Sequence, residues 1–274
     1  MNASVAHSSD QPVIGVDEAL EIVRAALRDW PAEIRATWGA LTLYALAAAI
    51  AARYGGSPLT APVATTVHVA TASLAYGALY RRAFGRPLGP LGLQFGLPEA
   101  RVLGASALVA IVLLFASVLA FIAIGAIALG LVMAVNPTGF NAGSEADWRA
   151  AFSGPLGFFV ALPPLLSLAG LIWLALRLSV APAASVAEDK LQALAVFPVT
   201  RGAAFGLLVI TAILGAPMLL ASAAATALGR APGAPHWLAS AALGAAFAFY
   251  AAPVWTGALA GVYQRLRPAS AAGN

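Results

Sequence analysis

The sequence contains no cysteine, which excludes disulfides, thiolate metal sites and cysteine nucleophiles. Charge is scarce as well, because only 9% of the 274 residues are charged, against about 25% in a typical soluble domain. The 15 basic residues include a single lysine and form no run that resembles a nucleic-acid patch. We therefore expect neither a soluble globular fold nor a nucleic-acid partner.

Catalytic signatures are also lacking. The chain has no phosphate-binding loop, no HExxH zinc motif and no GxSxG nucleophile elbow. Only 3 histidines are present, and the 11 carboxylates all lie outside the long apolar stretches. The first residues are polar and lack an apolar core, so we expect no cleavable signal peptide. We expect no enzymatic activity, no metal site and no cofactor.

Apolar residues are abundant instead: 61% of the chain is hydrophobic and the mean hydropathy is +0.86. The stretches without Asp, Glu, Lys or Arg are residues 36–52, 54–80, 102–144, 150–176, 202–229 and 231–264. A helix needs roughly 20 apolar residues to cross a bilayer. The stretches do not alternate apolar and polar residues as the strands of a membrane β-barrel do. The sequence therefore predicts an all-α, polytopic transmembrane bundle of six spans.

The third stretch leaves two alternatives, one long helix or a tight hairpin of two short helices. Residues 102–135 are apolar on every face and would form a helix about 50 Å long. Two full spans would need about 40 residues and a turn. Gly104, Gly125 and Gly130 lie inside, but no Pro, Asn or Asp turn signal precedes Asn136. We interpret the stretch as one long helix.

The basic residues divide unequally between the two sides of a six-span bundle. One side receives only Arg53, Arg149 and Arg230, and the other receives all the remaining arginines and the lysine. Basic residues stay on the cytoplasmic side of a membrane protein. We therefore predict a bacterial inner-membrane protein with both termini in the cytoplasm, in contact with membrane lipids, including anionic ones.

Two stretches outside the spans have the pattern of short helices. Residues 16–30 carry acidic residues early, basic residues late, and an apolar face that consists of Leu20, Val23, Leu27 and Trp30. This pattern predicts an amphipathic helix on the cytoplasmic membrane surface. Ser144 and Asp147 resemble a capping box, which predicts a helix at the outer interface. The domain interpretation is one membrane domain over residues 16–268, between disordered tails at 1–15 and 269–274.

His68 is the only ionisable residue deep inside a predicted span. Thr65 and Thr71 lie one turn to either side, so a small polar stripe faces one direction. An ionisable group inside a membrane can belong to a proton relay. It can equally be a neutral histidine that holds two helices together by a hydrogen bond. We favour the packing role, because no other span supplies a carboxylate.

Charged residues on the cytoplasmic side form a second candidate site. Glu99, Arg101, Arg177, Glu188 and Arg201 lie between or beside the spans and could gather into one polar cluster. A cleft holding Glu99, Glu188 and Arg177 together would favour a lipid-modifying enzyme. We favour salt bridges that anchor loops at the interface.

Small residues four positions apart recur in the apolar stretches. The pairs are Gly202 and Gly206, Gly257 and Gly261, and Ala126 and Gly130. Such pairs permit helices to approach closely. We interpret them as marks of internal packing rather than of dimerisation.

Parts of the cytoplasmic segments resemble a known group. The run from Arg177 to Ala183, the acidic Glu188, and residues 193–202 match the pattern R-x-S-x-A-x-P, an acidic residue, then A-x-x-S-W-x-L-T-x-G, with variable spacing. Residues 92–101 and 262–268 also look like this group. The chain therefore resembles uncharacterised bacterial membrane proteins that are similar to the membrane domain beside some glycerophosphoryl diester phosphodiesterases. The resemblance implies a six-span bundle.

The chain departs from that pattern in its second part. Phe197 stands where Trp is usual, Val196 replaces Ser, and Pro198 replaces a polar residue. The phosphodiesterase catalytic domain is absent, so its activity is not carried over.

Three functions remain open on the sequence alone. The first is a non-catalytic membrane protein that organises or regulates other envelope components, including other membrane proteins. The second is a transporter or permease for a small molecule, which His68 and the prolines within the spans would serve. The third is the membrane subunit of a lipid-modifying enzyme. We favour the first.

Overall fold

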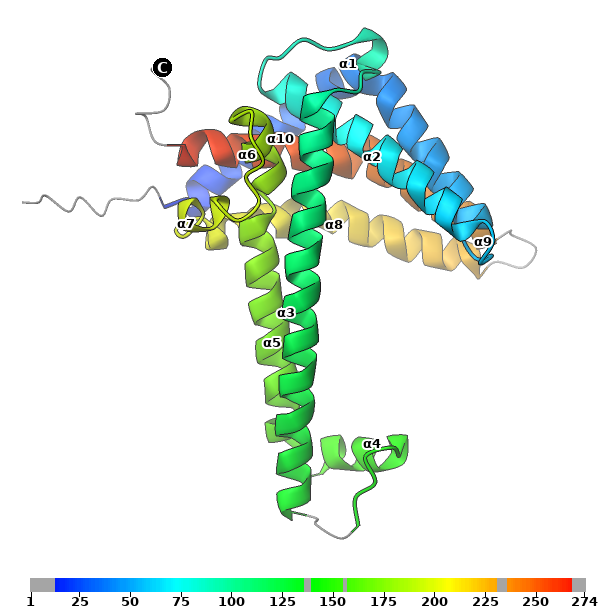
Figure 1. The fold of residues 1–274 in the computed structure, drawn as a ribbon, viewed down its shortest axis with the longest axis vertical. Helices are drawn as coiled ribbons and strands as arrows, with labels where there is room; N and C mark the ends of the chain where they lie inside the picture. Colours follow the sequence, from blue (N-terminus) through cyan, green and yellow to red (C-terminus); the bar gives the residue numbers. More distant parts are fainter. Residues whose placement is uncertain (1–12, 136–138, 155–156, 231–235, 268–274) are drawn as a thin grey trace, which may run out of the picture. The chain divides into compact units, whose positions relative to one another are not determined.

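The fold is all-α in the part of the chain that the structure describes. The structure is a computed structural model, and it describes residues 13–135, 139–154, 157–230 and 236–267. The elements in order are α1 (Val16–Tyr54), α2 (Ala61–Ala83), η1 (Pro90–Gly92), α3 (Leu97–Val135), α4 (Glu145–Ser153), α5 (Gly157–Leu178), α6 (Ala181–Ala187), α7 (Val196–Val199), α8 (Ala204–Gly229), α9 (His236–Ala246), η2 (Phe247–Ala251) and α10 (Ala252–Leu266) (Figure 1). The all-α prediction is confirmed.

Five stretches of the described residues are long and apolar enough to cross a membrane: Val16–Tyr54, Pro90–Ala134, Gly157–Ala187, Ala204–Gly229 and Trp237–Leu266. They indicate a multi-pass membrane protein. The helix α2 is not among them, because its threonines, its serine and His68 lower its hydropathy. The six-span count is therefore not confirmed.

The chain divides into two compact units, which we describe separately. Unit 1 comprises residues 1–106 and 177–274, and unit 2 comprises residues 107–176. The predicted disordered tails lie almost entirely outside the described residues. Ile14, at the inner edge of the first tail, is 2% exposed and is therefore anchored in unit 1.

In unit 1, α1 is continuous over the segment that the sequence predicts as a separate interfacial helix. The helix kinks at Thr37, where φ is −122° and ψ is 16°. The N-terminal half packs within the protein: Val23 is buried, and the indole of Trp30 donates to the carbonyl of Phe249 at 2.7 Å. A membrane-surface position of residues 16–30 stays a prediction.

The core of unit 1 is built mainly from small side chains. One cluster brings α1, α2, η2 and α10 together through Ala40, Leu41, Tyr44, Ala75, Ala78, Leu79, Ala248 and Ala252. A side chain at Gly257 would lie 3.7 Å from the Cβ of Ala26, and one at Gly261 would lie 3.5 Å from Ile22. This small pair therefore serves the internal packing of α10 on α1, as the sequence predicts.

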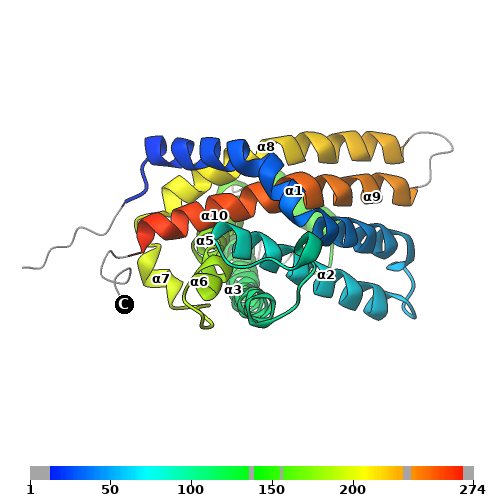
Figure 2. The same cartoon turned by 90° about the horizontal axis from the view of Figure 1, so that it is seen from above.

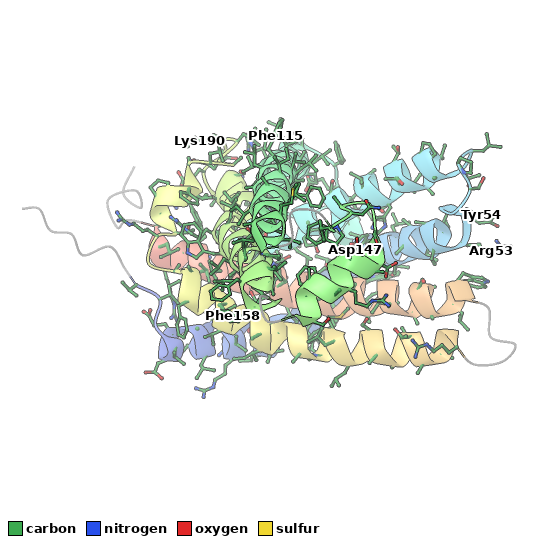
Figure 3. The ribbon with its side chains drawn as sticks, turned by 90° about the horizontal axis from the view of Figure 1, so that it is seen from below. Arg53, Tyr54, Phe115, Asp147, Phe158 and Lys190 are labelled. Carbon is green, nitrogen blue, oxygen red and sulfur yellow. The ribbon has the colours of Figure 1, made fainter. Side chains whose placement is uncertain are left out.

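Helix ends meet at one end of unit 1, which we call the charged end. Arg265 of α10 lies 3.0 Å from the Glu21 carboxylate of α1, and the Gln264 amide donates to the carbonyl of Ala83 at the end of α2. The start of α1, the end of α2 and the end of α10 are therefore neighbours. Figure 2 shows these helices running along a common direction with α8 and α9. Arg53 and Tyr54 lie at the opposite end, where α1 stops (Figure 3).

Unit 2 contains most of α3, all of α4 and most of α5. The sequence-based interpretation of residues 102–135 as one helix is confirmed, because α3 runs unbroken to Val135. Ser144 caps α4 by accepting a hydrogen bond from the Asp147 backbone at 3.2 Å, as the sequence predicts. Large apolar side chains such as Phe115 and Phe158, which are 66% and 68% exposed, point away from the unit (Figure 3). Such exposure is typical of helices that face lipid.

We expect Gly244→Ala to destabilise unit 1. The new Cβ would lie 2.8 Å from the Cβ of Ala48, so α9 and α1 would have to separate. Overpacking of this kind costs about 1–3 kcal/mol. Gly215→Ala on α8 is the matched control, since nothing lies within 4 Å of its new Cβ. The midpoint of thermal unfolding in detergent should fall for the first variant and hold or rise for the second, and equal midpoints would contradict the packing.

Candidate functional site

The charged end is organised around a buried ion pair between the last turn of α2 and the first turn of α3. The Arg81 guanidinium is bidentate on Glu99, with Nε 2.6 Å from Oε1 and Nη2 2.9 Å from Oε2. The backbone N–H of Gly96 also donates to Oε2, at 2.8 Å. Glu99 is 0% exposed and Arg81 is 8% exposed. The pair therefore satisfies both charges inside the protein, with the carboxylate placed at the positive end of α3.

Glycine makes room for this pair. Gly77 lies one turn before Arg81 on α2, and a Cβ there would lie 2.8 Å from Oε1 of Glu99. Any side chain at Gly77 would displace the carboxylate. Two glycines therefore position the pair. Gly77 leaves space for the carboxylate one turn before Arg81, and Gly96 donates to it three residues before Glu99.

A second ion-pair group surrounds Asp189, just after α6. Arg86 binds its carboxylate with two hydrogen bonds of 2.7 and 2.8 Å, and Arg101 donates a third. Hydrogen bonding to Arg86, helped by Arg101 and opposed by burial, lowers the pKa of Asp189 to about 2. The Asp189 side chain is 60% exposed, so this group adds less stability than a buried pair.

Glu188 binds α10. Its carboxylate accepts a hydrogen bond of 2.8 Å from the Tyr263 hydroxyl and lies 3.2 Å from Nε of Arg267. Arg177 instead lies over the Phe197 ring, 3.5 Å from its centroid, and donates to the Phe197 carbonyl. Arg201 is exposed.

The predicted cytoplasmic cluster is thus spread over separate contacts. Glu99 binds Arg81, Arg101 binds Asp189, and Glu188 binds Tyr263 and Arg267. The structure brings the five predicted residues to the same end of unit 1, but Glu99, Glu188 and Arg177 each bond to a different group. Glu99, Arg101 and Glu188 form ion pairs with partners that the sequence does not reveal. Their position at a membrane interface stays a prediction.

Of the polar stripe on α2, His68 lies beside α1. The His68 ring is 5.1 Å from the Tyr44 ring, and its Nδ1 is buried without a hydrogen-bond partner among the described residues. The Thr71 hydroxyl donates to the carbonyls of Val67 and His68, not to the imidazole. Thr65 is exposed. The predicted hydrogen bond from the ring to a threonine or carbonyl is not seen at Nδ1.

A polar cleft that was not predicted from the sequence lies between α1, the end of α2, and α10. It has a volume of about 550 Å³, and its charged lining residues are Asp29, Glu33, Arg82 and Arg265. Asp29 and Glu33 are four residues apart on α1 and therefore share a face. That spacing is visible in the sequence, but only the fold shows that Arg82 and Arg265 stand opposite. Small residues such as Ala25, Gly257 and Gly261 line the rest of the cleft.

Glu99→Gln should strongly destabilise the protein, because it leaves Arg81 buried without a counter-charge. Breaking a buried pair from one side costs about 3–5 kcal/mol. Glu145→Gln is the control: it breaks the Glu145–Arg149 pair, whose side chains are 87% and 78% exposed, and should change stability by less than about 0.5 kcal/mol. The double variant Arg81→Met, Glu99→Leu should recover much of the loss. Equal thermal-unfolding midpoints for Glu99→Gln and Glu145→Gln in detergent would rule out a structural role for the buried pair.

Comparison of the chain with protein-family models, with curated proteins and with solved structures gave no match. The resemblance to the membrane domain beside glycerophosphoryl diester phosphodiesterases therefore stays a prediction. The contact between Arg177 and Phe197 joins the two segments on which that resemblance rests.

Proposed function

We propose that this chain is a non-catalytic integral protein of a bacterial inner membrane that organises or regulates other envelope components. The proposal rests on what the polar side chains of the chain contact. Glu99, Glu188 and Arg101 bond to neighbouring helices or loops and so stabilise the bundle. An active site instead gathers such groups around one reacting position.

We propose six membrane spans: the five long apolar stretches and α2. The path of the chain within unit 1 supports this count. If α1 crosses the membrane, it leaves the charged end and stops at Tyr54, whereas α3 begins at the charged end, held there by Glu99. The chain must return between them, and α2 is the helix that does so. At 23 residues α2 is about 34 Å long, enough to cross the hydrocarbon core.

We further propose that the charged end faces the cytoplasm. Arg81, Arg82, Arg86, Arg177 and Arg265 lie there, and Arg53 lies at the other end. This distribution follows the rule that basic residues remain inside. Exposed cations at this end, such as Lys190 and Arg201, suit contacts with anionic lipid head groups.

Single cysteines would test the topology, because the natural chain has none. We expect Ser57→Cys, between α1 and α2, to react with a membrane-impermeant maleimide in intact cells. Gln94→Cys, between α2 and α3, should react only after the inner membrane is permeabilised. Both positions are exposed, so a difference in labelling reflects the side of the membrane and not burial of the cysteine. Labelling of both cysteines from the same side would show that α2 does not cross.

A deletion strain would test the role itself. An organising protein should tolerate single polar substitutions that leave its amount unchanged. We expect Arg101→Gln, Glu188→Gln and Arg201→Gln, each produced at the natural level, to restore the envelope integrity of the strain. Detergent sensitivity and leakage of a periplasmic marker measure integrity, and immunoblotting measures abundance. Failure of one of these variants at normal abundance, or a deletion strain with an unaltered envelope, would contradict the proposal.

A transporter is the second candidate, supported by the buried Nδ1 of His68 without a partner among the described residues. A ring nitrogen in that state is free to form a hydrogen bond with a ligand. His68→Gln in the same complementation assay separates the two functions. Full restoration favours the organising role, and loss of function at normal abundance favours transport.

A further inference from the structure

We propose that the cleft between α1, α2 and α10 binds a small zwitterion that carries an ammonium and a phosphate, the chemistry of phosphoethanolamine. The proposal deepens the proposed membrane role by naming a ligand class, but it rests on the geometry of unit 1 alone. The cleft volume of about 550 Å³ lies within the range of small-molecule sites, about 300–1,000 Å³.

A carboxylate oxygen in the cleft lacks a hydrogen-bond donor. Oε2 of Glu33 is buried and has no hydrogen-bond partner among the described residues, and the Glu33 side chain is only 18% exposed. Buried polar atoms in folded proteins are almost always satisfied, so this oxygen indicates that a donor is supplied from outside the chain. Asp29, one turn earlier on the same wall, is paired with Arg28 at 3.1 Å. An ammonium group donates three hydrogen bonds and suits the Glu33 carboxylate.

Arg82 has binding capacity to spare on the opposite side of the cleft. Its Nε lies 3.5 Å from Oε1 of Glu33, which is longer than a charge-assisted hydrogen bond, and 43% of its side chain is exposed. The partly exposed guanidinium lines the cleft and has donors that Glu33 does not occupy. Phosphate is the anion that a planar guanidinium binds best. Arg265, on α10, also lines the cleft, but its charge is paired with Glu21.

Charge balance selects a zwitterion over a simple ion. Asp29 is paired with Arg28 and Arg265 with Glu21, so the charges left to face a ligand are those of Glu33 and Arg82, which balance each other. A bare metal cation at Glu33 would also meet the charge of Arg82, 3.5 Å away. A zwitterion places an ammonium at Glu33 and a phosphate at Arg82, and so adds no net charge to the cleft.

The ligand can be the head group of phosphatidylethanolamine or the free soluble compound. The lining of Ala, Gly and Ile22 around the charges suits a lipid that enters along the helices. The experiment therefore includes both sources, and each tests the same chemistry.

The full-length protein would be purified in detergent, delipidated, and placed in nanodiscs of equal amounts of phosphatidylethanolamine, phosphatidylcholine and phosphatidylglycerol. Native mass spectrometry then measures which lipid stays bound on release. We expect phosphatidylethanolamine to be retained at least about tenfold over the other two. Phosphatidylcholine lacks the ammonium N–H donors, and phosphatidylglycerol lacks the ammonium. Soluble phosphoethanolamine added to the delipidated protein, with binding measured by calorimetry, tests the second source.

Two cleft variants test whether Glu33 binds the ammonium and Arg82 binds the phosphate. Glu33→Gln should abolish the preference for phosphatidylethanolamine over phosphatidylcholine, and Arg82→Gln should weaken retention of both lipids. Glu145→Gln, in unit 2, is the matched control and should leave the preference unchanged. If Glu33→Gln does not fold, the test uses the lipid preference of the natural protein and that of Asp29→Asn, a variant at a more exposed position. Equal retention of the three lipids without phosphoethanolamine binding, or a Glu33→Gln protein that keeps the preference, would overturn the proposal and leave a cleft filled by water only.

Discussion

The buried Arg81–Glu99 ion pair is the interaction on which the arrangement of unit 1 depends. It joins the end of α2 to the start of α3, at the point where the chain leaves unit 1. Burying two charges is expensive, and the pair is tolerated only because its geometry is bidentate and Gly96 satisfies a further lone pair. With these two helix ends fixed, Asp189 can reach Arg86 and Arg101, and the neighbouring Glu188 can reach Tyr263. The shorter elements between α5 and α8 are thereby connected to α2, α3 and α10.

The remaining packing follows from lipid as the solvent. Helices in a bilayer gain little from burying large apolar side chains, because lipid is as apolar as the protein interior. The core of unit 1 accordingly contains many alanines, and α9 approaches α1 so closely at Gly244 that a methyl group would not fit. Large residues such as Phe121, which is 77% exposed, face outward instead. Dispersion between closely spaced backbones, supported by the ion pairs at the charged end, replaces a conventional hydrophobic core.

Local patterns could be predicted from the sequence and long-range pairings could not. The unbroken α3 and the Ser144 cap depend on neighbours within a few residues, and both were predictable. The choice of Arg81 as the partner of Glu99 depends on where two helices meet, 18 residues apart in sequence. Arg101 is two residues from Glu99 in the sequence but binds Asp189, because the end of α6 is its neighbour in space. His68 and the threonines of α2 form its candidate polar site, and the same residues lower the hydropathy of the helix.

The N-terminal half of α1 shows how packing can select a helix face that hydropathy does not single out. The large apolar residues of this segment predict an amphipathic helix on a membrane surface. In the structure Ile22 and Ala26 instead pack against the small residues Gly261 and Gly257 of α10. Asp29 and Glu33 continue the same face by further turns, and all four of these α1 residues line the polar cleft. One face of α1 therefore both packs on α10 and forms a wall of the cleft. Hydropathy alone does not show this double role, because the face combines apolar and charged residues. The glycines of α10 lie opposite Ile22 and Ala26 and suit the close approach of the two helices.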